Sequence, residues 1–125
     1  RGDLPVARVR SEVGRRLIIG ASTHGIQEAN EAVAAGADVC GIGPMYSSQT
    51  KASLVPAGPV RLTEFLAAWP QVPHLAIGGI DPQSLHPLIE AGCRGIAVCD
   101  AVCSAEDPGA VVASMLESMR RSIAV

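Results

Sequence analysis

Residues 74–80 read His-Leu-Ala-Ile-Gly-Gly-Ile, in which the apolar run His74–Gly78 leads into a turn of two consecutive glycines. Three comparable runs lie at Leu17–Gly20, Asp38–Gly43 and Gly95–Cys99, each bounded by glycine or polar residues. Short runs that are almost continuously apolar are typical of parallel strands covered on both faces. Because a helical pattern follows each run, the sequence predicts an α/β fold built on parallel strands.

The helical patterns that surround these runs carry recognisable first and last residues. Asp81-Pro82 and Asp107-Pro108 each combine an N-capping carboxylate with a proline at the first helical position. The predicted helices are Leu4–Val13, Gly25–Ala35, residues 59–70 and the segments that follow Pro82 and Pro108, and glycines stop three of them: Gly14, Gly36 and Gly92. This order predicts right-handed crossovers between parallel strands. It leaves open whether the strands form a small open sheet or half of a barrel.

The composition favours layered α/β packing and argues against several classes of partner. The 125 residues suffice for one domain with a buried core, and only Tyr46, Phe65 and Trp69 are aromatic, so aliphatic side chains must build that core. The net charge is −2 and Lys and Arg form no stripe, so we expect no nucleic-acid or membrane partner. No run approaches the roughly 20 apolar residues of a membrane span, and we expect no signal peptide.

The cysteines Cys40, Cys93, Cys99 and Cys103 lack the paired spacing of zinc sites. Most of them lie in or beside apolar segments, which predicts buried, reduced thiols in a cytoplasmic protein. The chain begins at Arg1 without a methionine. We interpret this start as a position inside a longer protein.

Polar and glycine-rich motifs follow the predicted strands, at the edge where parallel sheets place their sites. In the motif 20–24, Ser22 can donate a hydrogen bond to a phosphate oxygen and His24 can act as an acid or base. The alternative for Ser22 and Thr23 is that their hydroxyls satisfy the start of the following helix.

The longest motif, residues 41–51, reads Gly-Ile-Gly-Pro-Met-Tyr-Ser-Ser-Gln-Thr-Lys. Its glycines allow the backbone to approach a ligand closely, and its hydroxyls and single ammonium group suit a phosphate. The connection from Tyr46 to Gly58 has no periodicity, which is typical of a binding loop or lid. The alternative is an ordinary polar loop.

Two further motifs, Gly78-Gly79 and Cys99-Asp100, follow the last two predicted strands. In a barrel these would be strands seven and eight, whose loops commonly bind phosphate through backbone N–H groups. The alternatives are a tight turn with positive φ for the glycines and a helix N-cap for Asp100. Asp3 is a candidate to hold Mg²⁺ together with a diphosphate, and its alternative is again an N-cap.

Taken together and in this order, the motifs resemble the thiamine phosphate synthase family. The resemblance spans nearly the whole chain and rests on these stretches: residues 3–5 (DLP), 20–24 (GASTH), 36–38 (GAD), 41–46 (GIGPMY), 50–51 (TK), 76–80 (AIGGI) and 95–98 (GIAV). GxGPxY followed by TK and then AIGGI is the specific combination, whereas each motif alone is weak.

The resemblance implies a (β/α)8 TIM barrel of which residues 1–125 supply the last four β/α units, the C-terminal half. It implies a cytoplasmic transferase that joins hydroxymethylpyrimidine diphosphate to thiazole phosphate and gives thiamine phosphate and diphosphate. In the family's reaction the diphosphate departs with the help of Mg²⁺ and cationic side chains, and the thiazole nitrogen captures the pyrimidine cation. Oriented charges that stabilise the leaving group carry most of such catalysis.

The resemblance also implies residue roles on the diphosphate side of the reaction. Asp3 matches a Mg²⁺ ligand, whereas Ser22 and Lys51 match catalytic residues that lie near the diphosphate. The family's other clamping residues lie on earlier strands that this chain does not contain, and Arg1 stands where the family usually has Gln. The chain alone is therefore expected to bind weakly and not to turn over.

On the thiazole phosphate side, the resemblance assigns loop hydroxyls and backbone groups. Ser48 and Thr50 would hold the phosphate from the loop, with Ser48 in place of a usual Thr. Backbone contacts would come from residues after the last two strands: Gly78, Gly79, Cys99 and Asp100. Asp100 stands where a Ser is common, and its carboxylate must point away from the phosphate to avoid repulsion.

Three alternatives remain at the level of sequence. A thiazole tautomerase has the same barrel and uses a His at the position of His24, although Tyr46 and Thr50-Lys51 favour the synthase. A non-catalytic half-barrel would associate with itself through its open sheet edges, as a homo-oligomer. A pentose-phosphate epimerase would need a set of His and Asp metal ligands that we do not find.

Overall fold

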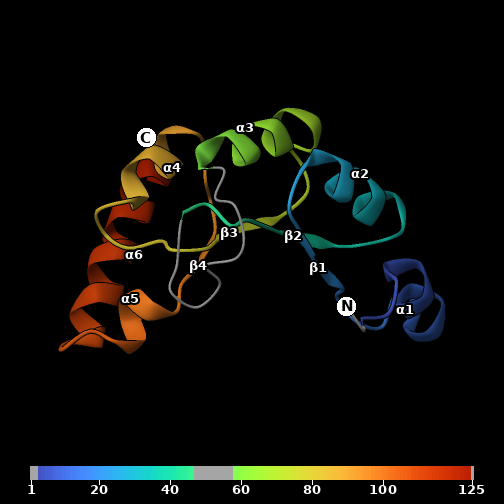
Figure 1. Cartoon of the computed structure of the whole chain (residues 1–125), viewed down its shortest axis with the longest axis horizontal. Helices are drawn as coiled ribbons and strands as arrows, with labels where there is room; N and C mark the ends of the chain where they lie inside the picture. Colours follow the sequence, from blue (N-terminus) through green and yellow to red (C-terminus); the bar gives the residue numbers. More distant parts are fainter. Residues whose placement is uncertain (1–2, 47–57, 125) are drawn as a thin grey trace.

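The computed structural model describes residues 3–46 and 58–124, which contain one parallel four-stranded sheet (Figure 1). Its strands lie in the order β1 (Gly20–Thr23), β2 (Val39–Ile42), β3 (His74–Ile77) and β4 (Ile96–Ala97). The helices are α1 (Val6–Val13), α2 (Ile26–Ala34), α3 (Pro59–Ala68), α4 (Leu85–Glu90), α5 (Asp100–Cys103) and α6 (Pro108–Ala124). No helix in these two ranges is both long enough and apolar enough to span a membrane.

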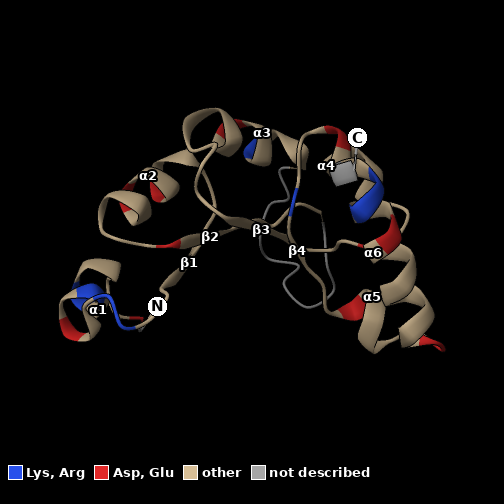
Figure 2. Cartoon of the chain, turned by 180° about the vertical axis from the view of Figure 1, so that it is seen from behind, with Lys and Arg blue, Asp and Glu red and all other residues tan. Residues whose placement is uncertain are grey.

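Helices α2, α3 and α4 lie along one side of the sheet, and both views agree on this arrangement (Figures 1 and 2). Phe65 is the one aromatic hydrophobic residue among the buried core residues in the described ranges, and α3 contributes Leu62 and Phe65 from its predicted inward face. Met115 and Met119 of α6 join the same core. The predicted helical faces therefore match the packing, and burial of such side chains contributes about 1.5–3 kcal/mol each.

The opposite side of the sheet differs from the prediction that the strands are covered on both faces. In β3, His74 and Ala76 are buried, whereas Leu75 and Ile77 remain 42% and 48% exposed. The alternation follows from the pleat, because successive side chains point to opposite faces. Among the described residues, helices cover only one of these faces.

The first strand was predicted at Leu17–Gly20, and this placement is wrong by three residues because β1 spans Gly20–Thr23. Pairing with β2 begins at Gly20, opposite Val39. Ile18 is 82% exposed because it lies before the paired segment, beside the open edge of β1. The predictions for the other strands agree with β2, β3 and β4 to within a few residues.

The N-cap prediction is confirmed for Asp107 and wrong for Asp81. The Asp107 carboxylate accepts the N–H of Ala110 at 3.1 Å, directly before α6. Asp81 instead forms a turn with Ser84: its carboxylate accepts the Ser84 N–H at 2.8 Å, and its own N–H donates to the Ser84 hydroxyl at 3.0 Å. Helix α4 therefore begins three residues later than the Asp-Pro pair indicates, with Ser84 as its N-cap.

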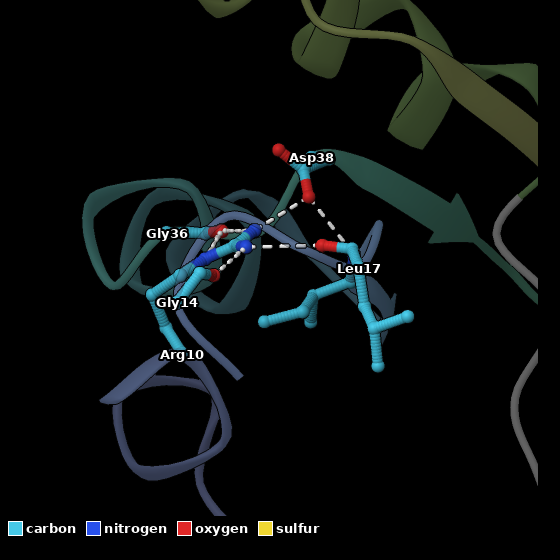
Figure 3. Close-up of polar contacts among 6 residues, drawn as sticks. Arg10, Gly14, Leu17, Gly36 and Asp38 are labelled. Atoms are coloured by element: carbon cyan, nitrogen blue, oxygen red, sulfur yellow. Dashed lines mark hydrogen bonds and ion pairs between the residues drawn. The ribbon is translucent and has the colours of Figure 1, made fainter. Parts of the chain in front are cut away.

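Helix α1 has no buried residue, and the Arg10 guanidinium attaches it to the sheet (Figure 3). Its Nε and Nη2 donate to the Gly36 carbonyl at 3.1 and 2.6 Å. Nη1 donates to the carbonyls of Gly14 and Leu17 at 2.7 and 3.1 Å, and Nη2 also contacts Asp38. The planar guanidinium of Arg10 thus binds the end of α1, the segment before β1 and the segment before β2 at the same time.

Asp38 completes this cluster at the amino-terminal edge of the sheet. Its carboxylate accepts the Ile19 N–H at 2.9 Å. This backbone hydrogen bond, followed by that from Arg10, lowers the pKa of Asp38 below its usual value. The charged form of Asp38 is therefore the one that the fold stabilises.

His74 is buried under α3 and is neutral in the fold. Its Nε2 accepts the Arg94 N–H at 3.1 Å, which a protonated ring could not do. Burial, and then the charge of Arg94, lower the pKa of His74 below the ordinary 6.5.

A stability measurement across pH tests this assignment. Because the unfolded chain binds the His74 proton more readily than the folded one, the free energy of unfolding should fall as the pH drops below 6.5. Urea unfolding from about pH 7 to about pH 5 should show this decrease. His74→Gln should flatten the profile, whereas His86→Gln, which changes an exposed His–Glu pair, should not. A wild-type profile that is flat over this range would contradict the buried neutral ring.

Candidate phosphate-binding site at the carboxyl ends of the strands

The segments that follow β2 and β3 lie against each other through backbone hydrogen bonds. The N–H groups of Met45 and Tyr46 donate to the carbonyls of Ile77 and Gly78, each at 2.9 Å. This contact requires glycine at two positions. A β-carbon at Gly43 would lie 2.3 Å from the Ile77 carbonyl oxygen, and one at Gly78 would lie 2.7 Å from the α-carbon of Pro44.

Gly78 and Gly79 have φ angles of 109° and 62°, which confirms the predicted turn with positive φ. This conformation and the close approach of Pro44 act together at Gly78. The turn also leaves a backbone donor available, because the Gly79 N–H donates to no acceptor within the described part of the chain. The Gly78 N–H instead belongs to the ladder that pairs Ile77 with Ala97. The glycines can therefore form a tight turn and also contribute to a ligand site.

A pair of available donors follows β4. The N–H groups of Cys99 and Asp100 have no acceptor among residues 3–46 and 58–124. Because Ile77 of β3 pairs with Ala97 of β4, this pair and the Gly79 N–H follow neighbouring strands at the same edge of the sheet. Backbone N–H groups collected in this way favour an anion.

Ser22 lies in β1, with its side chain exposed on the uncovered face. It pairs with Gly41, which in turn pairs with Leu75, so Ser22 is two strands from β3. The alternative that Ser22 and Thr23 cap the next helix is wrong, because Gly25 is the N-cap of α2 and no side chain caps that helix. The Ser22 hydroxyl has no partner among the described residues.

Thr23 and His24 have other roles at this edge. The Thr23 hydroxyl is buried and donates to the Gly41 carbonyl at 2.9 Å, which ties β1 to β2. The Glu28 carboxylate contacts the His24 N–H at 2.7 Å and its Nδ1 at 3.0 Å. His24 is therefore oriented by the first turn of α2.

Asp100 was expected to be either an N-cap or a phosphate contact, and the cap interpretation is wrong. Cys99 is the N-cap of α5, and no side chain caps this helix. The Asp100 carboxylate accepts the Ser104 hydroxyl at 2.7 Å, one turn further along. Figure 2 shows this acidic start of α5 beside β4.

Asp3 does not cap α1 either, because the N-cap is Pro5 and no side chain caps the helix. The Asp3 side chain is exposed. No three His, Cys, Asp or Glu side chains gather as metal ligands within the described ranges. Asp3 alone still fits Mg²⁺, which commonly uses one or two carboxylates and takes its other ligands from water and substrate phosphates.

Some predicted site residues lie outside the described residues: Ser48, Thr50 and Lys51.

The structure adds two contacts that the sequence did not indicate. Arg61 of α3 donates to the Gly43 carbonyl at 2.9 Å, and the Tyr46 hydroxyl donates to the Ser84 carbonyl at 2.9 Å. Burial, together with the charge of Asp81, raises the pKa of Tyr46, so its hydroxyl stays protonated. Both contacts hold the segment that leads into the predicted binding loop.

An open cavity of about 920 Å³ lies at the other edge of the sheet, away from the candidate site. Its lining includes Arg10, Leu17, Ile18 and Asp38. Arg10 and Asp38 already bind each other and the backbone. The volume therefore lies at the amino-terminal ends of the strands, and the donors after β3 and β4 remain the stronger candidate for a ligand site.

Comparison with known proteins shows which family the chain is similar to. A family model described as thiamine monophosphate synthase matches residues 1–102. A thiamine-phosphate synthase of Gloeobacter violaceus is 45% identical over 119 residues, which cover 95% of this chain and 35% of the relative. One from Geobacillus kaustophilus is 39% identical over 119 residues, covering 94% of this chain and 53% of the relative.

A solved structure shows the same arrangement of elements. It is a thiamine phosphate pyrophosphorylase from Pyrococcus furiosus, with a TM-score of 0.85 and 31% sequence identity. The match covers 98% of this chain and 57% of that one. The chain thus spans about a third to a little over half of the length of these relatives.

Proposed function

Because the chain belongs to the thiamine monophosphate synthase family, we propose that it forms part of an enzyme that makes thiamine phosphate. In this proposal residues 1–125 are the C-terminal half of a (β/α)8 barrel in a cytoplasmic transferase. The full-length enzyme joins hydroxymethylpyrimidine diphosphate to thiazole phosphate and releases diphosphate. The relatives named above carry the synthase name, which favours the synthase over the tautomerase.

One observation carries the proposed role of this chain: three N–H groups after β3 and β4 have no acceptor among the described residues. They belong to Gly79, Cys99 and Asp100, and Gly78 forms the turn that presents the first of them. We assign them to the phosphate of the thiazole substrate, with the Ser48 and Thr50 hydroxyls as additional donors. The Asp100 carboxylate does not oppose this role, because Ser104 binds it one turn along α5.

The diphosphate would lie on the β1 side of the same edge. Ser22 presents there a hydroxyl that has no partner among the described residues, and Lys51 would add a positive charge. Asp3 precedes α1 and would supply one oxygen ligand for Mg²⁺. The bound ion would offset the charge of the departing diphosphate. This chain would thereby hold both phosphorylated groups and orient the thiazole nitrogen toward the reacting carbon.

The open side of the sheet provides the surface for the rest of the barrel. β1 and β4 are the edge strands of the described sheet, and Leu75 and Ile77 are exposed on its uncovered face. We assign this surface to the remaining strands of the full-length protein. In the isolated chain, the same edges favour self-association, which light scattering would detect as a mass above 12.8 kDa.

Product analysis separates the synthase from the tautomerase. The full-length protein, supplied with hydroxymethylpyrimidine diphosphate, thiazole phosphate and Mg²⁺, should release thiamine phosphate and diphosphate in equal amounts. A protein that forms neither product and only isomerises a thiazole carboxylate phosphate would overturn the synthase proposal. It would instead favour a role for the His24–Glu28 pair.

Replacement of Ser22 tests the diphosphate assignment. In the full-length protein, Ser22→Ala should lower kcat by about 10- to 100-fold, because one hydrogen bond to a departing anion is lost. The KM for thiazole phosphate should change little, since that phosphate lies two and three strands away, at β3 and β4. Ser118→Ala, on an exposed position of α6, is the matched control. An unchanged kcat in the Ser22→Ala variant would contradict the assignment of Ser22 to the diphosphate.

A further inference from the structure

The cysteines were predicted to be buried, but only Cys40 and Cys93 are buried, and Cys99 and Cys103 are exposed. Cys99 is the N-cap of α5, and Cys103 is the last residue of that helix. The Cys103 N–H donates to the Cys99 carbonyl at 2.8 Å, so the two residues are one α-helical turn apart.

The two thiols differ in their readiness to react. A negative charge on Cys99 raises the pKa of Cys103, and the Cys99 side-chain hydrogen bond and the Asp100 charge raise it further. The raised pKa leaves less thiolate on Cys103, and the thiolate is the nucleophile of thiol–disulfide exchange. The first attack therefore falls to Cys99 and the resolving attack to Cys103.

A bridge between these positions would deform the turn that contains them. Residues four apart in a helix have β-carbons about 5–6 Å apart, whereas a disulfide brings β-carbons to about 3.5–4.5 Å. The backbone of α5 must therefore move when the bridge closes. The N–H groups of Cys99 and Asp100 are part of this turn and have no acceptor in the described ranges.

We propose that Cys99 and Cys103 form a thiol–disulfide exchange site, and that their bridge weakens phosphate binding at the carboxyl end of β4. The second half of this statement rests on the proposed function, which places a substrate phosphate on the Cys99 and Asp100 N–H groups. The co-reactant is a small-molecule disulfide. Exposed or strained disulfides are the labile ones, so the bridge is reversible.

The exchange conserves atoms and electrons over two steps. The Cys99 thiolate attacks one sulfur of the small disulfide, forms a mixed disulfide and releases one small thiolate. Cys103 then gives up its proton, attacks the Cys99 sulfur and displaces the second small thiolate. The protein loses two hydrogen atoms, and the small disulfide is reduced to two thiols.

Peptide mass detects the bridge directly. The full-length protein is treated with oxidised glutathione, alkylated under denaturing conditions and digested with trypsin. Cleavage after Arg94 and Arg120 gives one peptide, residues 95–120, that contains both thiols. We expect this peptide to be lighter by two hydrogen atoms, without alkylation or glutathione. Cys40 and Cys93, both buried, should be alkylated and serve as internal controls. Retention of two alkylated thiols or two glutathione adducts would overturn the proposal.

Single replacements test the order of attack. Cys103→Ser should trap one glutathione on Cys99, because no resolving thiol is present. Cys99→Ser should acquire glutathione on Cys103 more slowly than Cys103→Ser acquires it on Cys99, because the Asp100 charge still raises the pKa of Cys103 when the Cys99 thiol is gone. Equal rates in the two variants would contradict the assigned roles.

Phosphate titration tests whether the bridge weakens phosphate binding. The dissociation constant of inorganic phosphate should rise by about tenfold on oxidation and return after reduction. A bridged protein with an unchanged constant would overturn the coupling to phosphate. If the reduced protein binds no phosphate, the proposed phosphate site fails, whereas the peptide mass still decides whether the bridge forms.

Discussion

Replacement of Gly78 by alanine is expected to destabilise the full-length protein by about 3 kcal/mol or more and to abolish phosphate binding. Two costs coincide at this residue. Its φ of 109° is strained for any residue with a side chain. The new β-carbon would also lie 2.7 Å from the Pro44 α-carbon and 3.0 Å from the Met45 nitrogen, which are backbone atoms that cannot rotate away. Urea unfolding and phosphate titration measure the two effects.

Gly25→Ala is the matched control for this replacement. Gly25 has an extended φ of 179°, and a β-carbon there meets no atom within 4 Å. The unfolding midpoint of this variant should stay close to that of the wild type. If Gly78→Ala were as stable as Gly25→Ala, the close packing of the segments after β2 and β3 would be incorrect.

The second large effect is expected at Arg10, whose replacement by alanine should lower the thermal midpoint by roughly 5–10 °C. The change removes every hydrogen bond from the guanidinium to Gly14, Leu17 and Gly36. It also leaves the Asp38 carboxylate with only the Ile19 N–H as a partner among the described residues. Because α1 buries no side chain, nothing apolar in α1 compensates.

Two further measurements separate this cluster from ordinary surface charge. Arg8→Ala is the control, since Arg8 makes only an exposed 3.6 Å pair with Glu12 and should change the midpoint little. The pKa of Asp38 is lowered in the fold, so its contribution is present above the usual value of 3.8 and is lost as the pH falls through the folded pKa. Arg10→Ala should reduce this acid dependence. Equal midpoints for Arg8→Ala and Arg10→Ala would contradict the role of the Arg10 guanidinium.

Strand β3 and its double glycine could be predicted from sequence because local pattern and tertiary pairing agree there. A short apolar run followed by a positive-φ turn at Gly78 is compatible with few structures other than a buried strand that ends in this turn. The first strand was misplaced because Leu17 and Ile18 are apolar, although pairing with β2 begins only at Gly20. Apolar residues before an edge strand look the same in sequence as the strand itself.

The candidate site was predictable in outline for a similar reason. Residues that follow parallel strands meet at one edge, so Gly78, Gly79, Cys99 and Asp100 could be grouped from their order alone. The partners of individual side chains could not be predicted, because they depend on distant contacts. Arg10 reaches Asp38 across 28 positions, and no local spacing indicates this pair.

The central claim is that the backbone N–H groups after β3 and β4 bind a substrate phosphate, and amide NMR tests it most directly. Inorganic phosphate, and then thiazole phosphate, is titrated into the isotopically labelled full-length protein. The account predicts saturable shifts of the three amides at Gly79, Cys99 and Asp100, while the Arg10 cluster remains unchanged. Saturable shifts confined to other residues, with these three amides unaffected, would contradict it.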